Sequence, residues 1–263
     1  MNGNFQGKAG IITGAAGGIG SATARRLSAE GAQLLLVDRN EVALKTLVDE
    51  IRALGGECDF AVADVSEDAS VQAYVAQASN TFDRIDFFFN NAGIEGPMCS
   101  VLTFQEADFD KVIAVNLKGV FLGMRYVLPI MVKQGFGSIV NTGSIASARG
   151  LAGSIAYTAA KHAVLGMVRT GAADLAGTNV RLNCVMPGMV DTPMLRKIIH
   201  ETFDGDLNKG LKGMGSVSPM HRVAQPEEIA AGVVFLLSDD ASFINGVALP
   251  IDGGTLATIP YNG

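Results

Sequence analysis

The chain of 263 residues is 48% hydrophobic and 17% charged, with 20 basic and 26 acidic residues and a net charge of −6. One hydrophobic core can serve a chain of this length, so we expect a single domain over residues 1–263. The acidic balance argues against nucleic acid as a partner, because phosphate backbones attract a basic surface. The sequence shows neither a signal peptide nor an apolar run near the ~20 residues of a membrane span, which predicts a cytoplasmic protein without a membrane partner.

Short apolar runs alternate with longer helical patterns along the whole chain. The apolar runs predict strands at 9–13, 33–38, 58–64, 85–91, 137–144, 179–186 and 246–254. Helices are expected from a glycine-rich turn to near Gly31, over 41–54, 68–82, 106–134 and 155–176, and from Pro226 onward. This alternation predicts an α/β fold: a Rossmann-type, doubly wound parallel sheet of seven strands with helices on both faces. The ligand site of such a sheet lies at the carboxyl ends of its strands.

A glycine-rich turn follows the first predicted strand and opens a helix. Its glycines are Gly14, Gly17, Gly18 and Gly20. Missing side chains let the backbone approach a pyrophosphate at the helix N-terminus, although ordinary turn chemistry would explain such a turn equally well. The acid Asp38 at the end of the second strand favours a dinucleotide site.

Asp38 and Arg39 bear on the choice of cofactor. The carboxylate of Asp38 can accept hydrogen bonds from a ribose and would repel a 2′-phosphate, although it can also be a plain strand-end cap. The guanidinium of Arg39 could instead pair with a 2′-phosphate, which leaves NADP as an alternative. Because the glycine turn contains no basic residue, we predict NAD rather than NADP.

Tyr157 and Lys161 are four residues apart on a predicted helix and so share one face. An ammonium beside a phenol stabilises the phenolate, as does the positive charge of oxidised nicotinamide, and Tyr157 can then exchange an alcohol proton. Ser144 ends the fifth predicted strand, where its hydroxyl can hold a substrate oxygen. Taken singly, each residue also fits a structural role, and Asn116, a poor helix former within 106–134, can be a packed side chain.

Together these motifs resemble the short-chain dehydrogenase/reductase family over essentially the whole chain. The family spacing T-G-x-x-x-G-x-G falls on Thr13, Gly14, Gly18 and Gly20. The catalytic tetrad that the resemblance implies is Asn116, Ser144, Tyr157 and Lys161. The other cofactor-binding residues that it implies are Ile19, Asp64, Val65, Asn91, Ala92, Gly93, Pro187, Gly188, Val190 and Thr192.

The resemblance implies an NAD-dependent oxidoreductase that moves a hydride between nicotinamide and a secondary alcohol or ketone. Lys161 would also hydrogen-bond the nicotinamide ribose, and Asn116 would help to hold a water that links Lys161 to solvent. Relatives usually form homotetramers through two long helices, here 106–134 and 155–176.

The segment 189–216 occupies the position of the family's mobile lid over the substrate. Apolar residues there and in the loop after the fifth strand predict a small, free, mostly apolar and cyclic substrate. Those assigned to the pocket are Ile145, Leu151, Met189, Met194 and Leu195. Glu95 can add one polar contact, although a loop acid facing solvent is the simpler expectation. Residues 88–96 and 236–245 resemble bacterial enzymes that act on cyclic or aromatic ketones.

Other functions stay open at this point. A 3-oxoacyl-(acyl-carrier-protein) reductase would use the same residues, and a stripe of cations spaced by seven could dock an acidic carrier. The stripe consists of Lys111, Lys118 and Arg125. A cis-dihydrodiol dehydrogenase also shares the catalytic residues, and a non-enzymatic NAD-sensing protein could use the same fold.

Metal and hydrolase chemistry have little support in the sequence. The three histidines, His162, His200 and His221, lack ligand spacing, so we expect no catalytic metal. Ser144 lies in TGSIA rather than in a G-x-S-x-G turn, which argues against a hydrolase. Cys58, Cys99 and Cys184 are far apart and are expected to be reduced packing thiols.

Overall fold

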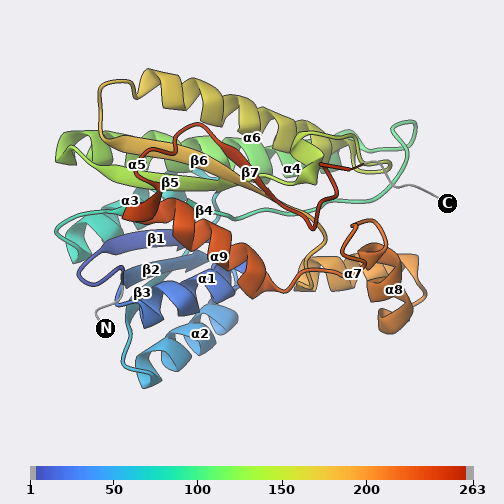
Figure 1. The fold of residues 1–263 in the computed structure, drawn as a ribbon, viewed down its shortest axis with the longest axis horizontal. Helices are drawn as coiled ribbons and strands as arrows, with labels where there is room; N and C mark the ends of the chain where they lie inside the picture. Colours follow the sequence, from blue (N-terminus) through green and yellow to red (C-terminus); the bar gives the residue numbers. More distant parts are fainter. Residues whose placement is uncertain (1–3, 259–263) are drawn as a thin grey trace.

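The computed structural model describes residues 4–258 and contains one parallel sheet of seven strands (Figure 1). The strand order is β3-β2-β1-β4-β5-β6-β7, as expected for a doubly wound sheet. The strands are β1 (Ala9–Thr13), β2 (Gln33–Asp38), β3 (Glu57–Val62), β4 (Phe87–Asn90), β5 (Gly137–Thr142), β6 (Val180–Pro187) and β7 (Ala248–Ile251). The predicted fold class is therefore confirmed.

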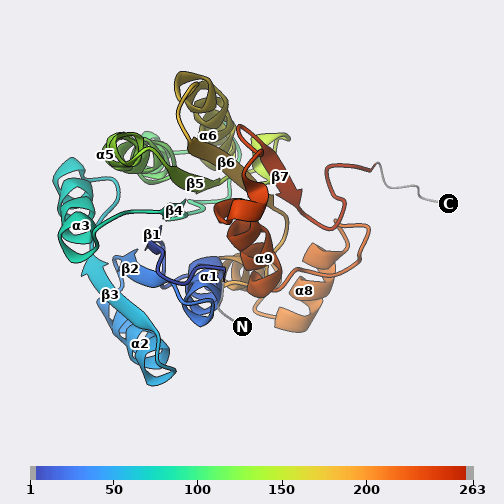
Figure 2. The ribbon, with the colours of Figure 1, turned by 60° about the vertical axis from the view of Figure 1, so that its left-hand side comes forward.

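Helices cover both faces of the sheet, because the central strands are apolar on both sides (Figure 2). One face is covered by α1 (Gly18–Ala29), α2 (Glu41–Ala53) and α9 (Pro226–Leu237). The other is covered by α3 (Asp68–Thr81), α5 (Gly119–Gln134) and α6 (Ile155–Asp174). Neighbouring residues of one strand enter opposite cores: Phe88 packs with α3 and α5, while Phe87 and Phe89 pack with α1 and α9. This arrangement explains the continuous apolar run of β4.

The helix expected over 106–134 is continuous but not uniform. It consists of α4 (Glu106–Ile113), a π-helical turn η1 (Ala114–Lys118) and α5, and it ends at Gly135, whose φ is 81°. By length and composition this helix is apolar enough to cross a bilayer. Its buried residues instead pack on the sheet and against α3 and α6, so we interpret it as a core helix.

Several predicted strands are too long at their carboxyl ends. β5 stops at Thr142 rather than at 144, because Ser144 leaves the sheet and caps a 3₁₀ turn, η2 (Ile145–Ser147). β7 covers only Ala248–Ile251 of the predicted 246–254, because Asp252 begins a turn. The residues lost from the strands lie at the edge of the sheet where ligands bind, so they are free to face a ligand.

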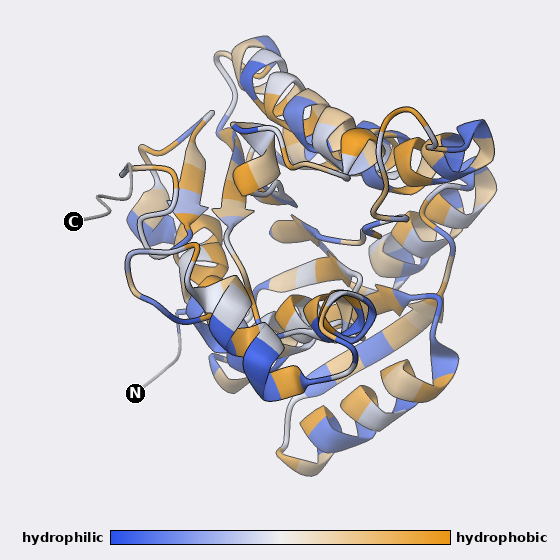
Figure 3. Ribbon diagram, turned by 90° about the vertical axis from the view of Figure 1, so that its right-hand side faces the viewer, coloured by the Kyte–Doolittle hydropathy of each residue, from blue (hydrophilic) through white to orange (hydrophobic). Residues whose placement is uncertain are grey.

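The predicted lid is a helical excursion from the sheet. It holds α7 (Pro193–Thr202) and α8 (Leu207–Gly215), and the chain returns through a parallel bridge between Val190 and Ala224. Leu195 and Ile199 of the lid form a small core of their own with Val223 of the returning chain. Figure 3 looks onto this end of the molecule and shows hydrophilic and hydrophobic stretches alternating along the helices, as amphipathic helices do.

Candidate active site

The glycine-rich turn between β1 and α1 packs tightly against the segment after β4. Gly14 has a φ of +63°, and a Cβ there would lie 2.9 Å from the Cα of Ala92, so only glycine fits without strain. A Cβ at Gly20 would lie 2.1 Å from the carbonyl oxygen of Gly14. The N-cap of α1, Gly17, provides no side-chain cap, and the first turn holds no acidic residue. The free N–H groups of that turn can bind a pyrophosphate, so these residues fit a dinucleotide.

Asp38 lies at the end of β2, beside this turn. Its Oδ2 accepts a hydrogen bond from the N–H of Ala16 at 3.1 Å, and its Oδ1 accepts one from the N–H of Asn40 at 3.0 Å. These bonds hold the carboxylate against the glycine-rich turn, at the edge of the cavity described below. Arg39 is exposed and is not one of the residues that line the cavity.

Asp64 and Val65 follow β3. The hydroxyl and the N–H of Ser66 donate to Asp64 Oδ1 at 2.7 and 2.9 Å. These hydrogen bonds, with a smaller contribution from Arg39, hold the pKa of the Asp64 carboxyl below its usual range. Val65 packs on α5, where its Cγ2 would lie 2.9 Å from a Cβ at Gly119. The role of both residues toward an adenine stays a prediction.

A polar network joins the carboxyl ends of β1, β4 and β5. The Asn91 amide donates to the carbonyl of Thr13 at 3.1 Å and accepts from the hydroxyl of Thr142 at 3.0 Å. The Thr13 hydroxyl accepts from the N–H groups of Asn91 and Ala92 at 2.9 and 3.2 Å. The Lys161 ammonium donates to the carbonyl of Thr142 at 2.7 Å. The network therefore links the glycine-rich turn to Lys161 through Thr142, which the sequence did not single out.

A cavity of about 470 Å³ lies between the glycine-rich turn, the loop after β5 and the lid. This volume lies within the range of small-molecule sites. The predicted cofactor and catalytic residues in its lining are Gly14, Gly18, Ile19, Asp38, Asn91, Gly93, Ser144, Tyr157, Lys161, Pro187, Gly188, Val190 and Thr192. All six predicted substrate residues also line it: Glu95, Ile145, Leu151, Met189, Met194 and Leu195. Within residues 4–258, the predicted residues outside the lining are Gly20, Arg39, Asp64, Val65, Ala92 and Asn116.

Ser144 lines the cavity and caps the 3₁₀ turn η2. Its Oγ accepts from the N–H of Ala146 at 3.1 Å, while the Oγ of Ser147 accepts from the N–H of Ser144 at 3.2 Å. This reciprocal capping box fixes the side chain. The bond from Ala146 uses a lone pair of Oγ, so the O–H can still donate, either to Tyr157 or to a substrate oxygen.

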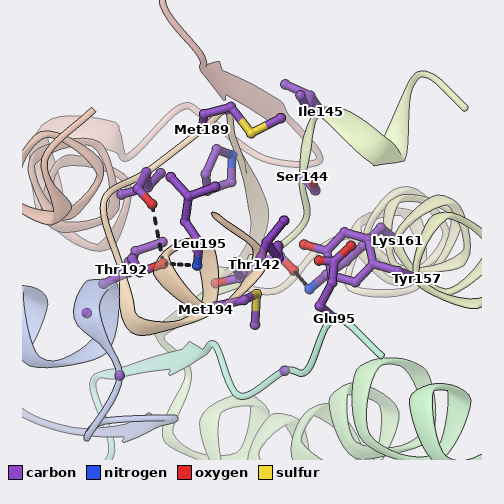
Figure 4. Close-up of a pocket in the computed structure, with 18 of the residues that line it drawn as sticks. Glu95, Thr142, Ser144, Ile145, Tyr157, Lys161, Met189, Thr192, Met194 and Leu195 are labelled. Carbon is purple, nitrogen blue, oxygen red and sulfur yellow. Dashed lines mark hydrogen bonds between the residues drawn. The ribbon is translucent and has the colours of Figure 1, made fainter. Parts of the chain in front are cut away.

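Tyr157 and Lys161 lie together on α6 and line the cavity (Figure 4). The Lys161 Nζ is 5.5 Å from the centre of the Tyr157 ring. Burial raises the pKa of Tyr157 above its ordinary value, the Glu95 carboxylate raises it further, and the Ser144 hydroxyl lowers it. Burial also lowers the pKa of Lys161 to about 8, against the opposing effects of Cys184 and Glu95. Burial and Glu95 thus outweigh the hydrogen bond from Ser144, and the phenol stays protonated at neutral pH.

Asn116 lies in the π-helical turn η1 and is completely buried. Its Oδ1 accepts from the N–H of Ile94 at 2.8 Å, and its Nδ2 donates to the carbonyl of Ile94 at 2.7 Å. A Cβ at Gly93 would lie 3.2 Å from Asn116 Oδ1 and 3.7 Å from Lys161 Nζ. The side chain therefore positions the segment beside Lys161, and its role in holding a water stays a prediction.

Glu95 does not face solvent, so the simpler expectation for this residue was wrong. The side chain is partly buried, lines the cavity and accepts from the hydroxyl of Ser154 at 3.0 Å. Burial raises the pKa of its carboxyl, while the Ser154 hydrogen bond and Lys161 lower it. The reason for the error is tertiary: the segment 151–154 folds back onto residues 95–99, where the N–H of Cys99 donates to the carbonyl of Gly153 at 2.9 Å.

The base of the lid closes the dinucleotide side of the cavity. A Cβ at Gly188 would lie 2.9 Å from the Cα of Asp252, and one at Gly18 would lie 2.7 Å from Cγ2 of Thr192. Thr192 caps α7, accepting from the N–H of Leu195 at 3.3 Å. Of the apolar lid residues, Ile198 and Met214 also face the cavity, whereas Ile199 packs inside the lid.

The remaining features considered in the sequence analysis are the cationic stripe, possible metal ligands and the cysteines. Lys118 and Arg125 of the cationic stripe lie near Asp68 of α3, whose pKa is lowered mainly by hydrogen bonds from Tyr126 and Gln72 and additionally by these cations. Within residues 4–258, no group of three or more His, Cys, Asp or Glu side chains is placed to hold a metal ion. The three cysteines are free thiols, and burial raises the pKa of Cys184 to about 11.

Comparison with known proteins agrees with this geometry. A family model described as Enoyl-(Acyl carrier protein) reductase matches residues 14–255. Levodione reductase of Leifsonia aquatica is 43% identical over 94% of this chain and 93% of its own length. The 3-oxoacyl-(acyl-carrier-protein) reductase FabG of Thermotoga maritima is 39% identical, over 95% and 98% of the two chains. Cyclohexanol dehydrogenase of Acinetobacter sp. is also 39% identical, over 96% of both.

Solved structures lead to the same group of proteins. A crystal structure of levodione reductase superposes with a TM-score of 0.93, covering 97% of this chain and all of that one. A structure of actinorhodin polyketide ketoreductase with NADPH is 30% identical in sequence. It superposes with a TM-score of 0.91, covering 98% of this chain and all of that one. The chain belongs to the short-chain dehydrogenase/reductase family, which binds nicotinamide cofactors, and the relatives named here are oxidoreductases of alcohols and ketones.

Proposed function

We propose that the protein is an NAD(H)-dependent oxidoreductase that interconverts a secondary alcohol and its ketone. The observation that carries this proposal is one cavity that brings Asp38 and the glycine-rich turn together with Ser144, Tyr157 and Lys161. An NAD-sensing protein would need the first part of that cavity but would have no use for an acid/base pair in the second. The combination therefore favours the enzyme over the non-enzymatic alternative.

NAD is the cofactor that the end of β2 favours. The Asp38 carboxylate is held at the cavity edge by two backbone N–H groups, where it can accept hydrogen bonds from a ribose and repel a 2′-phosphate. The free N–H groups at the start of α1 would bind the pyrophosphate. Arg39, exposed beside Asp38, is the residue through which NADP would have to be recognised.

The catalytic residues of this chain move one proton and orient one oxygen. The cofactor, when bound, supplies or accepts the hydride. Ser144 donates its O–H to the substrate oxygen, and Tyr157 gives its phenolic proton to that oxygen in ketone reduction or takes it back in alcohol oxidation. Lys161 is held toward the site by its hydrogen bond to the carbonyl of Thr142. Its positive charge favours the phenolate of Tyr157, and its buried position suits a contact with the nicotinamide ribose.

A small, free, cyclic ketone or alcohol is the substrate class that the cavity supports. Its substrate side is walled mainly by apolar side chains of the loop after β5 and of the lid, which are Ile145, Leu151, Met189, Met194 and Leu195. Two of the relatives carry names that refer to compounds of this type, levodione and cyclohexanol.

A second candidate is reduction of a 3-oxoacyl group on a carrier protein. Similarity to FabG favours it, and so does the exposed stripe of Lys111, Lys118 and Arg125 along α4, η1 and α5. Asp68 beside Lys118 and Arg125 weakens the attraction of that stripe for an acidic carrier. A cis-dihydrodiol dehydrogenase, which would use the same catalytic residues, also remains a candidate.

Steady-state kinetics distinguish these candidates. The assay compares cyclic ketones, a 3-oxoacyl carrier-protein substrate and a cis-dihydrodiol, each with NAD(H) and with NADP(H). We expect the highest kcat/KM for a free cyclic ketone with NADH. If the carrier-linked substrate has the higher kcat/KM and Lys118→Glu abolishes that advantage, the proposed substrate class is wrong.

We also propose that the protein assembles as a homotetramer through the α4–α5 helix and α6. The large apolar side chains exposed on the first of these, Phe109, Phe121 and Val132, support a protein partner on that face. Sedimentation analysis at micromolar concentration tests this, and a monomer or a dimer would contradict it.

A further inference from the structure

Glu95 places a carboxylate among the apolar side chains of the substrate side of the cavity. The residue follows Gly93 in the segment after β4, and its Oε1 accepts a hydrogen bond from the Ser154 hydroxyl at 3.0 Å. Figure 4 shows the side chain beside Tyr157 and Lys161, the two groups closest to the proposed reaction. Its charge acts on both, since it raises the pKa of the phenol and of the ammonium. A substrate whose oxygen meets Tyr157 therefore has Glu95 within reach of its carbon framework.

The carboxylate keeps acceptor capacity that Ser154 does not use. Two ionised carboxylate oxygens offer about four acceptor positions, and Ser154 is its sole hydrogen-bond partner within residues 4–258. Water can occupy the other positions while the cavity is open. An apolar ligand that expels this water leaves a partly buried charge without compensation, which is costly. A ligand that brings its own donor avoids that cost.

The surrounding side chains increase the advantage of a ligand that brings a hydrogen-bond donor over an apolar ligand. Leu151, Met98, Met189 and Met194 line the same cavity and offer no strong hydrogen-bond donor. Lys161 is a cation that acts on the Glu95 carboxyl, but its ammonium is buried and already donates to Thr142. Once water is expelled from this side of the cavity, a donor on the ligand can complete the hydrogen bonding of Glu95.

We propose that Glu95 is a specificity-determining residue that selects substrates with a hydroxyl or ammonium group on the ring that carries the reacting carbonyl. This inference deepens the proposed function and rests on it. It replaces the mostly apolar substrate expected from the sequence with an amphipathic one, whose apolar edge faces the lid and whose donor faces Glu95.

A purely structural role for Glu95 makes a different prediction. The Ser154 hydrogen bond could simply brace residues 95–99 against 151–154. In that case Ser154→Ala, which removes the brace and keeps the carboxylate, would change the kinetics in the same way as removal of Glu95. If Glu95 recognises the substrate, Ser154→Ala keeps the preference for donor-bearing ketones.

The test measures kcat/KM for matched ketone pairs at pH 7 in the wild type, Glu95→Gln, Glu95→Leu and Ser154→Ala. The neutral pair is 4-hydroxycyclohexanone and 4-methylcyclohexanone, and the cationic pair is 4-(dimethylamino)cyclohexanone and 4-isopropylcyclohexanone. The 3-substituted compounds are measured as well, so that the position of the donor on the ring is also varied. Within each pair the shape is conserved and the donor is not.

We expect the wild type to prefer the donor-bearing member by roughly 10- to 100-fold, the range for leaving one buried polar group unpaired. Glu95→Leu should reverse the preference, gaining activity on the donor-free ketone. Glu95→Gln should lose the preference for the ammonium but keep part of that for the hydroxyl, which an amide oxygen still accepts.

Two results would overturn the inference, and only the second would also overturn the proposed function. Reduction of every ketone at similar kcat/KM, unchanged in Glu95→Leu, removes selection by Glu95 and leaves the proposed function intact. Failure of the wild type to reduce any of these ketones with NADH or NADPH overturns the proposed function as well.

Discussion

Replacing Lys161 by methionine should greatly lower turnover without destabilising the fold. The side chain is 3% exposed, and burial lowers the pKa of its ammonium from 10.5 to about 8. A shift of this size corresponds to about 3 kcal/mol of unfavourable free energy for folding with the ammonium charged. Methionine has a similar shape and carries no charge, so the variant is relieved of that cost.

The opposing contribution is the hydrogen bond from Lys161 to the buried carbonyl of Thr142, at 2.7 Å. Leaving that carbonyl without a donor costs about 1–3 kcal/mol. The net change in the free energy of unfolding at pH 7 should therefore lie between zero and about 2 kcal/mol in favour of the variant. Turnover should fall by at least ~10²-fold, because the proton transfer of Tyr157 loses its neighbouring charge.

Urea unfolding at constant protein concentration, from pH 7 to pH 10, measures both the sign and the pH dependence. Because the folded-state pKa of Lys161 lies below the unfolded one, the wild type gains stability as pH rises from about 8 toward 10.5. Lys161→Met lacks this gain, so any advantage of the variant shrinks with rising pH. The exposed Lys133→Met serves as the control. A variant less stable than wild type by more than about 2 kcal/mol at pH 7, or a difference independent of pH, would refute this reasoning.

Three further changes test the cofactor side and the electrostatics. Asp38→Ala should weaken NADH binding and raise the kcat/KM for NADPH relative to NADH; a wild type that already prefers NADPH would contradict the role of Asp38. Gly14→Ala should lower NADH affinity at least ~10-fold because its Cβ meets backbone at 2.9 Å, whereas Gly150→Ala, with open space around it, should not; equal affinities would disprove the tight turn. Glu95→Gln removes a charge that raises the pKa of Tyr157, so the pH profile of alcohol oxidation should shift to lower pH, and an unchanged profile would count against that contact.

The sequence predicts the sheet well because its strands are apolar on both faces. Phe87, Phe88 and Phe89 are each completely or almost completely buried, on alternating sides, and a run of this kind has few alternatives to a central parallel strand. Strand ends are predicted less well. Ser144 and Asp252 are polar residues whose side chains bond the local backbone, and these bonds end β5 and β7 earlier than hydropathy suggests.

The residues of the candidate site also fall into those that the sequence predicts and those that it does not. Residues that act through local geometry, such as Gly14 with its positive φ and Tyr157 one turn from Lys161, leave a pattern in the sequence. Residues that act through tertiary contacts do not. Thr142 is placed by two hydrogen bonds: its hydroxyl donates to Asn91 and its carbonyl accepts from Lys161, and both partners are far away in the chain.

Glu95 is the clearest example of what a sequence pattern cannot show. Its burial depends on a segment 59 residues later in the chain, where the hydroxyl of Ser154 donates to its carboxylate. A loop acid with no local partner is usually solvated, so the expectation from sequence was reasonable but wrong. Only the folded chain reveals that this carboxylate faces the cavity.

The central claim is that Tyr157 exchanges the proton with the substrate oxygen, and Tyr157→Phe tests it most directly. The measurement is kcat for ketone reduction at pH 7, together with the Kd for NADH from fluorescence titration. Tyr74→Phe is the matched control, because Tyr74 is also buried and its hydroxyl has no hydrogen-bond partner in the described structure. We predict a loss of at least ~10²-fold in kcat for Tyr157→Phe, with NADH affinity largely kept and Tyr74→Phe active. Near-normal turnover in Tyr157→Phe would contradict the account.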